Sequence, residues 1–450
     1  MKLRLFLLLL LFPLLSNYAQ NIEFGGNVAL NALLYNADES PFWFHSNRRG
    51  RINETTNFSG VINTSAIYQL SPNSYLEAGI GALYQDGYHD ELQLDESYLA
   101  FNNTWLSIIA GRKQREMLYS GLSATNQNIL WSINSRPLPG IRIFTNRPIF
   151  FKNNRGLGFE ASWEEYLMDD ERYVDNTRLH HKSFNLVYKH SPKFQISAGL
   201  QHFVQWAGTH PEFGDLPSDF SAYTKVVTGK GVGDDAGDNI SEQEVNGLGN
   251  HLGSYEIKLN TIVAGYRVEL IYNHLFEDGS GAELANTPDG RYGIYIEDPR
   301  ASNDWFQAVM YEFYYTKNQS KNTPTSDGTD NYFNNNLYRS GWTYENRVMG
   351  VPFITLGENR FRIANNKIVV HHLGLTGLAF KKYPYRFLGS YRQNYGGKGS
   401  GYRSRDIFST YLDLNLLQNY VNLNLQVGAD FSEIAAPNFG AGLSLSKKIF

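Results

Sequence analysis

The amino-acid sequence predicts an all-β fold, a transmembrane outer-membrane β-barrel of about 18 antiparallel strands with long extracellular loops and short periplasmic turns. Three features predict it. Hydrophobic side chains recur at every second position in most segments, short and long connections alternate along the chain, and an export signal precedes the first segment.

The composition narrows the class of protein. The chain has 450 residues, of which 42% are hydrophobic and 14% aromatic, so it has enough apolar surface to fold. It contains no cysteine, which excludes a disulfide framework, a thiolate metal site, a cysteine nucleophile and a lipoprotein anchor. The formal net charge of -4 supplies no basic field, so no nucleic-acid partner is predicted.

Residues 1–19 are predicted to be a signal peptide that is cleaved after Ala19. Lys2 and Arg4 give a cationic start, and residues 5–15 form an apolar run. A helix that stays in the membrane would need about 20 apolar residues. We therefore expect export of the mature chain and a location in the bacterial outer membrane.

Residues 20–450 are predicted to form a single outer-membrane β-barrel domain. The alternation is clearest in segment 194–206, where Phe194, Ile196 and Leu200 share one face and mostly glutamine, serine and glycine occupy the other. Uncharged polar residues and glycine suit a wet lumen better than the packed core of a soluble sandwich.

The alternation and the turn residues place the strands with ends good to about 3 residues. The predicted strands lie near 22–35, 58–70, 75–84, 92–101, 105–112, 141–151, 156–165, 182–190, 194–206, 252–261, 264–276, 291–297, 304–316, 365–380, 384–395, 406–417, 420–430 and 438–450.

The connections between these strands fall into two series. The short series comprises 71–73, 102–104, 191–193, 381–383 and 418–419, and the long series includes 36–57, 113–140, 207–251, 277–290 and 317–364. Short turns on one side and long loops on the other are typical of outer-membrane barrels. An even number of strands leaves both ends of the chain on the periplasmic side.

The last predicted strand ends on the aromatic residue Phe450. A terminal aromatic residue after an alternating strand resembles the signal that the barrel-insertion machinery recognises, so that machinery is a predicted partner. The match is partial, because Phe450 is out of phase with Leu443 and Leu445. Tyrosine and tryptophan are expected mainly in the two interfacial girdles, so their abundance does not by itself predict a binding site.

Two histidine pairs and one acidic run contain potential metal ligands. His180-His181 and His371-His372 are adjacent on strands, so each pair points to opposite faces and cannot chelate one metal. The run 233–238 offers oxygen ligands for Ca²⁺ but lacks the EF-hand spacing. We interpret it as a solvated loop, with bound calcium as the alternative, and predict no metal site and no cofactor.

Two further segments lie near the predicted outer mouth. Residues 386–405 combine arginine, lysine and tyrosine, which attract anions and stack on sugar rings, although the same cations also suit the phosphates of outer-membrane lipid and lipopolysaccharide. Residues 122–137 are long and poorly charged for a surface loop, so we expect them to fold into the barrel mouth.

The chain contains no nucleophile elbow, HExxH motif, P-loop or dinucleotide fingerprint, and we predict that it is not an enzyme. A Ser/His/Asp arrangement assembled across strands at the rim stays an alternative.

Several short segments, in order between about residue 100 and the end, resemble the Wzi family of outer-membrane capsule assembly proteins. They are Trp105-Leu106-Ser107 with the loop ending Arg136-Pro137, Gln205-Trp206-Ala207-Gly208, Gly249-Asn250-His251-Leu252-Gly253-Ser254-Tyr255-Glu256-Ile257-Lys258-Leu259, Tyr272 with Glu277-Asp278, and Phe439-Gly440-Ala441-Gly442-Leu443. The resemblance implies an eighteen-stranded barrel whose outer face acts as a lectin that retains or organises capsular polysaccharide or exopolysaccharide, without catalysis. Members can carry an N-terminal helical bundle, for which this sequence leaves no room.

The alternative to this function is a passive diffusion porin, because eighteen strands with a polar lumen face can leave an aqueous channel. For the polysaccharide-binding reading, loop position alone suggests the contact residues. They are Trp131, Arg136, Trp206, Tyr223, Trp342, Arg392, Tyr402 and Arg403.

Overall fold

The computed structural model describes residues 22–152, 154–230, 247–300, 305–321, 330–357, 362–398 and 404–449. The predicted signal peptide, the acidic run 233–238, Tyr402, Arg403 and Phe450 lie outside these residues. The expectations about them stay predictions.

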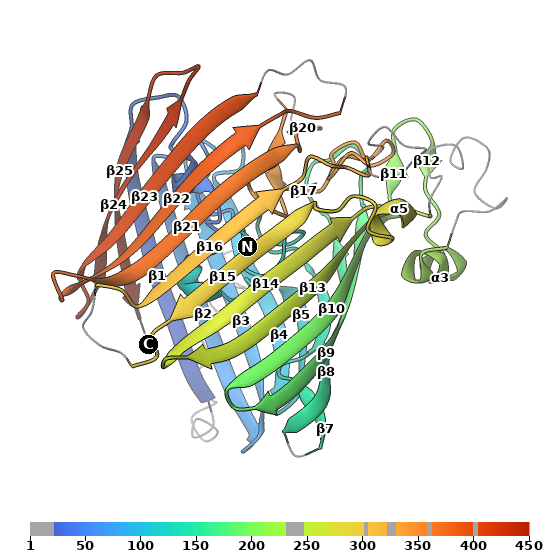
Figure 1. Ribbon diagram of the computed structural model, residues 1–450, viewed down its shortest axis with the longest axis horizontal. Helices are drawn as coiled ribbons and strands as arrows, with labels where there is room; N and C mark the ends of the chain where they lie inside the picture. Colours follow the sequence, from blue (N-terminus) through green and yellow to red (C-terminus); the bar gives the residue numbers. More distant parts are fainter. Residues whose placement is uncertain are drawn as a thin grey trace, which may run out of the picture.

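The main sheet contains 19 strands and closes into a barrel (Figure 1). Its first strand, β1 (Ile22–Tyr35), pairs antiparallel with β2 (Phe58–Ser71) on one side and with β25 (Asn438–Lys448) on the other. Strands β6 (Gly140–Thr145) and β7 (Ile149–Lys152) both pair with β8 (Arg155–Leu167), so together they occupy one place in the wall. The predicted antiparallel barrel of 18 strands is therefore confirmed.

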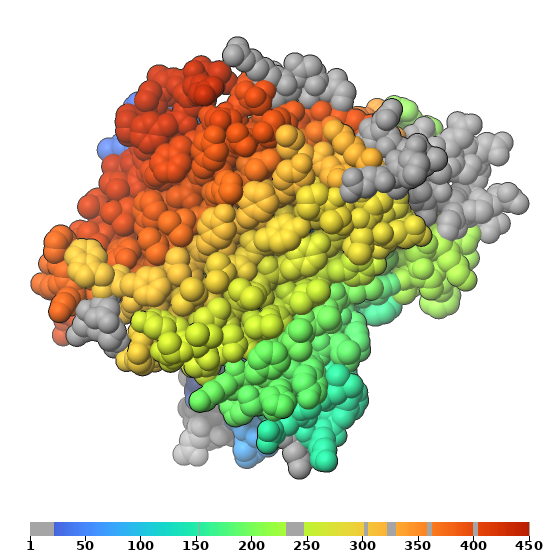
Figure 2. All heavy atoms as spheres, viewed as in Figure 1, coloured from blue at the N-terminus to red at the C-terminus, as the bar shows by residue number. Residues whose placement is uncertain are grey.

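The other strands of the wall follow in chain order. They are β3 (Ser74–Gln85), β4 (Leu92–Asn103), β5 (Leu106–Arg112), β9 (Arg178–Ser191), β10 (Phe194–Trp206), β13 (Asn250–Val263), β14 (Tyr266–Phe276), β15 (Gly290–Glu297), β16 (Ala308–Tyr315), β21 (Ile368–Ala379), β22 (Tyr383–Asn394), β23 (Arg405–Leu417) and β24 (Asn422–Ser432). In the space-filling view, the strands from β10 to β24 form one continuous outer surface (Figure 2).

The long connections contain short elements of their own. Within the described ranges the helices are α2 (Phe42–His45), the one-turn 3₁₀ helix η3 (Tyr119–Gly121), α3 (Phe220–Thr228) and α5 (Gly279–Ala282). The short paired strands are β11 (Thr209–His210), β12 (Gly214–Asp215), β17 (Thr343–Tyr344), β18 (Arg347–Val348), β19 (Thr355–Leu356) and β20 (Ile363–Asn365). No helix in the described ranges is both long enough and apolar enough to cross a membrane.

Two predicted strands differ from the observed ones in an informative way. The predicted strand 141–151 is interrupted between β6 and β7, because Pro148 has no N–H to donate to the sheet. The predicted strand 182–190 begins earlier, at Arg178, where His180 and His181 continue the pairing with β8. Their rings point to opposite sides, since His181 stacks on the interior Phe203 while His180 contacts Trp163 on the outer wall.

The predicted faces of β10 are confirmed. Phe194, Ile196 and Leu200 are exposed on the outside of the barrel, whereas Gln201 and Gln205 are buried inside it. Because lipid replaces water around a membrane barrel, an apolar outer face and a polar inner face are what such a strand requires.

The interior of the barrel is filled by the long connections. Segments 36–57 and 113–139 and the described parts of 316–367 supply buried side chains that pack against inward-facing residues of the wall. Trp43 and Phe353, for example, pack edge to face with ring centroids 5.8 Å apart, and Phe353 packs against Tyr314 of β16. The expectation that residues 122–137 fold into the barrel is confirmed, because Leu122, Ile129 and Leu130 are fully buried.

A buried ion pair fixes this filling to the wall. Arg291 of β15 and Glu312 of β16 are both fully buried, with Nη2 and Oε1 2.8 Å apart. The two oxygens of Glu312 also accept hydrogen bonds from Ser123 Oγ at 2.8 Å and from the backbone N–H of Ala124 at 2.7 Å. The plug segment, defined here as residues 113–139, is thus held by a charge-assisted contact in the barrel interior.

Candidate functional site

A cavity of about 590 Å³ lies at the end of the barrel that carries the long connections. Its walls come from the segment around α2, from the segment that contains β18 and β19, and from the ends of β22, β24 and β25. We call it the mouth cavity. Its volume falls within the range of about 300–1,000 Å³ that is usual for ligand pockets.

The walls of the mouth cavity are tied to one another. The backbone N–H of Phe42 donates to Asp430 Oδ2 at 2.8 Å, which fixes α2 to β24. Arg347 donates to the backbone oxygen of His45 at 3.2 Å and to Asn53 Oδ1 at 3.1 Å, which fixes β18 to the first loop. These contacts join loops that are remote in sequence, so the cavity is preformed.

Among the predicted contact residues that the structure describes, Arg392 is the one that lines this cavity. It points inward from β22 and is only 5% exposed. Its guanidinium lies 3.9 Å from the centre of the Phe42 ring, and Nη2 donates to Ser409 Oγ at 2.9 Å. Within the described part of the chain, Nε has no hydrogen-bond partner. A buried cationic side chain therefore stands at the wall of the cavity.

Two buried acceptors accompany this donor. Asp430 Oδ1 and Asn438 Oδ1 have no hydrogen-bond partner in the described ranges, and both residues line the mouth cavity. Leaving a buried polar atom unpaired costs free energy, so native structures satisfy nearly all of them. The wall of the mouth cavity is therefore polar, which suits a hydroxyl-rich ligand.

His45 at the wall of the cavity is neutral under ordinary conditions. Burial, and then the positive charges of Arg347, Arg392 and Arg48, hold the pKa of its imidazole well below the usual value. Its Nδ1 lies 3.0 Å from Ser40 Oγ. His45 therefore contributes polar ring atoms to the cavity but no positive charge.

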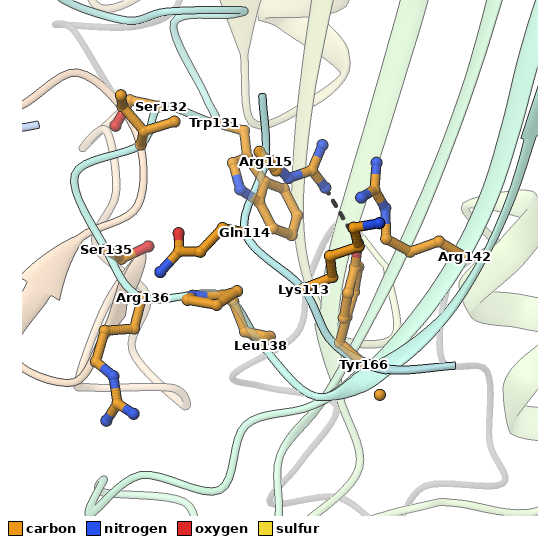
Figure 3. A pocket seen from close by; sticks show the side chains of 13 residues that line it. Lys113, Gln114, Arg115, Trp131, Ser132, Ser135, Arg136, Leu138, Arg142 and Tyr166 are labelled. Atoms are coloured by element: carbon orange, nitrogen blue, oxygen red, sulfur yellow. Dashed lines mark hydrogen bonds between the residues drawn. The ribbon is translucent and has the colours of Figure 1, made fainter. Parts of the chain in front are cut away.

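Trp131 and Arg136 lie together around a small closed space inside the plug segment, with a volume of about 20 Å³ (Figure 3). Arg115 covers the Trp131 ring at 4.1 Å, while Arg136 points away from it. Arg136 pairs with Glu345 at 2.9 Å and donates to the backbone oxygen of Leu94 at 2.6 Å. In this arrangement both side chains hold the plug together and neither offers a free surface to a polymer.

The structure places Trp342 in the core and Trp206 with Tyr223 on the outer wall. Trp342 is fully buried, and its Nε1 donates to the backbone oxygen of Leu130 at 2.6 Å. Trp206 points outward from β10 and packs against α3, which carries Tyr223 and lies outside the barrel (Figure 1). These three residues therefore do not meet Arg392 in one site.

The sequence interpretation missed most residues of the mouth cavity, among them His45, Arg347, Asp430 and Asn438. They come from three distant parts of the chain, and no spacing connects them. Asp430 carried the one available signal, since it places a carboxylate on the inward face near the outer end of a strand. In the described ranges, no group of three or more His, Cys, Asp or Glu side chains is arranged to hold a metal ion.

A comparison with protein families tests the resemblance that the short sequence segments indicated. The family model for capsule assembly protein Wzi matches residues 26–355, which is more than half of the chain. The chain belongs to the Wzi family. The predicted resemblance is thereby confirmed, and the fold is that of an outer-membrane barrel.

A solved structure of a Wzi protein shares this fold. Wzi of Escherichia coli, an outer membrane protein involved in group 1 capsule assembly and described as a carbohydrate-binding β-barrel, is 12% identical, with a TM-score of 0.60. The alignment covers 96% of this chain and 85% of that chain. OpdO of Pseudomonas aeruginosa is 11% identical with a TM-score of 0.49, and the alignment covers 95% of this chain and 97% of OpdO. No curated protein sequence matches the chain.

Proposed function

We propose that this Wzi-family barrel binds capsular polysaccharide or exopolysaccharide at the cell surface and anchors or organises it there without catalysis. The observation that carries the proposal is the mouth cavity, where a buried donor on Arg392 and buried acceptors on Asp430 and Asn438 lack partners among the described residues. Membership of a capsule assembly family supports the same substrate class.

The binding mechanism is multivalent. One cavity takes a short part of the polymer, and each contact is weak. A repeating polymer meets many barrels on one cell, so the second and later contacts form at a high effective concentration. Retention at the surface then needs no tight single site.

Filling the cavity tests the proposal in cells. Thr355 is exposed and lines the mouth cavity, so Thr355→Trp reduces the space for a ligand without disturbing the buried core. In cells that lack the native protein, we expect this variant to release more surface polysaccharide into the medium than the wild type does. Thr224→Trp on the exposed side of α3 is the matched control and is expected to retain it. Equal retention by both variants at equal barrel levels would contradict the proposal.

The alternative function, a passive diffusion porin, is less well supported. A porin needs an open lumen, whereas here the interior side chains Trp43, Trp342 and Phe353 are fully buried against one another and the wall. Stable single-channel currents through the purified protein in planar bilayers would favour the porin. A rim enzyme, the third reading, requires turnover that disappears when one rim Asp, Ser or His is changed.

Export and assembly complete the proposal. The N-terminal signal is proposed to direct the chain to the periplasm, and the barrel-insertion machinery to place it in the outer membrane. Outer-membrane lipid and lipopolysaccharide would then surround the apolar face that Phe194, Ile196 and Leu200 expose.

A further inference from the structure

The outer wall of the barrel changes from apolar to polar beside α3. On β9 and β10, Phe184 and Leu200 are paired, face outward and are 52% and 43% exposed. The next outward-facing pair toward the outer end is Lys182 with His202, and His180 follows on β9. A charged side chain on the lipid face is costly at the centre of the bilayer but costs little near its surface. The change from Phe184 to Lys182 therefore marks the outer boundary of the lipid-facing band.

Helix α3 lies outside the barrel and is fixed to the wall at this boundary (Figure 1). Tyr223 Oη donates to Glu165 Oε1 at 2.5 Å, and Trp163 Nε1 donates to Tyr223 Oη at 3.2 Å. Lys182 Nζ donates to the backbone oxygen of Val227. Trp163 and Lys182 are paired on β8 and β9, so both belong to the polar row next to the apolar one. The helix thus lies where the apolar band ends, and Lys182 directs its charge toward the helix rather than toward lipid.

Helix α3 has an apolar stripe besides the one that packs on the barrel. Ala222 and Val226 are buried against outward-facing residues of β10. Phe220, Tyr223 and Val227 are three and four positions apart, so they form a second stripe along the helix. The contacts of Tyr223 with side chains of β8 place this second stripe over the lipid-facing wall.

Phe220 is the exposed end of the second stripe. Its side chain is 80% exposed. The polar residues Ser221, Thr224 and Thr228 are also exposed and form the opposite edge of the helix. A helix with one apolar and one polar edge is typical of the membrane interface, where tryptophan side chains such as Trp163 are also enriched. Because α3 continues the lipid-facing wall, the lipid of the outer leaflet is the surface that Phe220 meets.

We propose that α3 is an interfacial helix that binds the outer leaflet of the membrane, with Phe220 inserted between lipid headgroups and acyl chains and Thr224 in water. The inference assigns a second ligand, a lipid surface, and does not depend on polysaccharide binding. It also gives Trp206 and Tyr223, which were expected to contact polysaccharide, the role of holding this helix against the barrel.

The first test measures the depth of single side chains in the membrane. The chain contains no cysteine, so Phe220→Cys, Thr224→Cys and the lipid-facing reference Leu200→Cys each accept a single nitroxide label. In vesicles of dilauroylphosphatidylcholine, oxygen concentrates in the lipid and a nickel chelate stays in water. The label at 220 should collide mainly with oxygen, as the label at 200 does, whereas the label at 224 should collide mainly with the nickel chelate.

The second test removes the apolar ring. In the same vesicles, Phe220→Asp should speed hydrogen exchange of the amides of residues 223–228 by about 10-fold, because burial of an aromatic ring contributes at least that factor. An acidic residue in the first turn favours a helix by itself, so faster exchange reports the lost lipid contact. Thr224→Asp on the polar edge is the matched control and should leave the exchange rates near those of the wild type.

Three results would overturn the inference. One is a label at 220 that meets the nickel chelate as often as the label at 224 does. Another is a label at 220 that neither reagent reaches, since a second protein copy would then cover Phe220. The third is equal exchange in Phe220→Asp and the wild type. Migration of the folded barrel in unheated gels verifies that each variant has folded.

Discussion

Some arginine side chains inside this barrel form ion pairs with buried carboxylates and stabilise the fold, whereas Arg392 lines the mouth cavity and makes no direct contact of that kind within the described residues. Arg291 belongs to the first group, because Glu312 neutralises it and Glu312 in turn holds Ser123 and Ala124 of the plug segment. A buried pair of this kind contributes little net stability as a unit, but removing one partner leaves the other charge uncompensated.

Glu312→Gln therefore should destabilise the protein by about 3–5 kcal/mol. The measurement is the free energy of unfolding in urea for the detergent-solubilised barrel. Glu297→Gln is the matched control, since its partner Arg267 is largely exposed and the pair is separated by 3.3 Å. Exposed pairs contribute about 0–1 kcal/mol. Equal effects of the two substitutions would mean that the Arg291–Glu312 pair does not anchor the plug.

At the scale of single residues, the sequence indicated which residue types could bind a sugar but not which of them face the mouth cavity. Trp131, Arg136 and Trp342 were expected to contact polysaccharide because they lie in long loops, but these loops turn inward and bury them. Arg392 was predicted correctly as a residue near the mouth. Which loop residue faces a ligand depends on packing between distant segments, and no local pattern in the sequence records that packing.

Among the elements, two of the long connections carry buried aspartates that respond to pH. Asp289 and Asp330 lie in connections that meet at the outer end of the barrel, where Tyr332 donates to Asp289 and Ser320 donates to Asp330. Burial raises the pKa of Asp289 to about 6, and burial together with the neighbouring Asp278 raises that of Asp330 to about 6. Both carboxyl groups therefore bind protons more readily in the folded loops than in unfolded chain.

A folded-state pKa above the ordinary aspartate value of 3.8 stabilises the loops fully below that value, and the stabilisation is lost as pH rises through about 6. We therefore expect the amide protection factors of residues 316–321 and 330–333 to fall between pH 4 and pH 6. Hydrogen exchange with correction for the intrinsic rate measures this. In Asp330→Asn the fall should be smaller, whereas protection that increases with pH would contradict the assignment.

The strands were predictable because each one obeys a local rule. A barrel strand needs apolar residues toward lipid and polar residues toward the interior, and this period of two is visible in segments such as 194–206. Helix α3 was not predicted, although Asp219 caps its start and Gly229 ends it with a φ of 66°. Its nine residues are too few to show a helical period, and it forms against the outer wall through tertiary contacts.

On the scale of the whole molecule, the barrel is a rigid support for a filled mouth. The number of strands and the alternating loop lengths predicted the barrel wall. The poorly charged segment 122–137 predicted that at least one loop folds into the barrel interior. The other two inserted loops and the cavity between them arise from contacts such as Phe42 with Asp430 and Arg347 with Asn53. These contacts join residues hundreds of positions apart, which is why the sequence alone did not reveal the cavity.

The most direct test of the central claim is the binding of the purified, detergent-solubilised protein to the surface polysaccharide of its own cell. We expect saturable binding that a generic dextran does not compete and that Thr355→Trp weakens, because this substitution fills the mouth cavity. Absence of binding across a range of salt and calcium concentrations, or equal competition by dextran, would contradict the claim that the barrel recognises this polysaccharide.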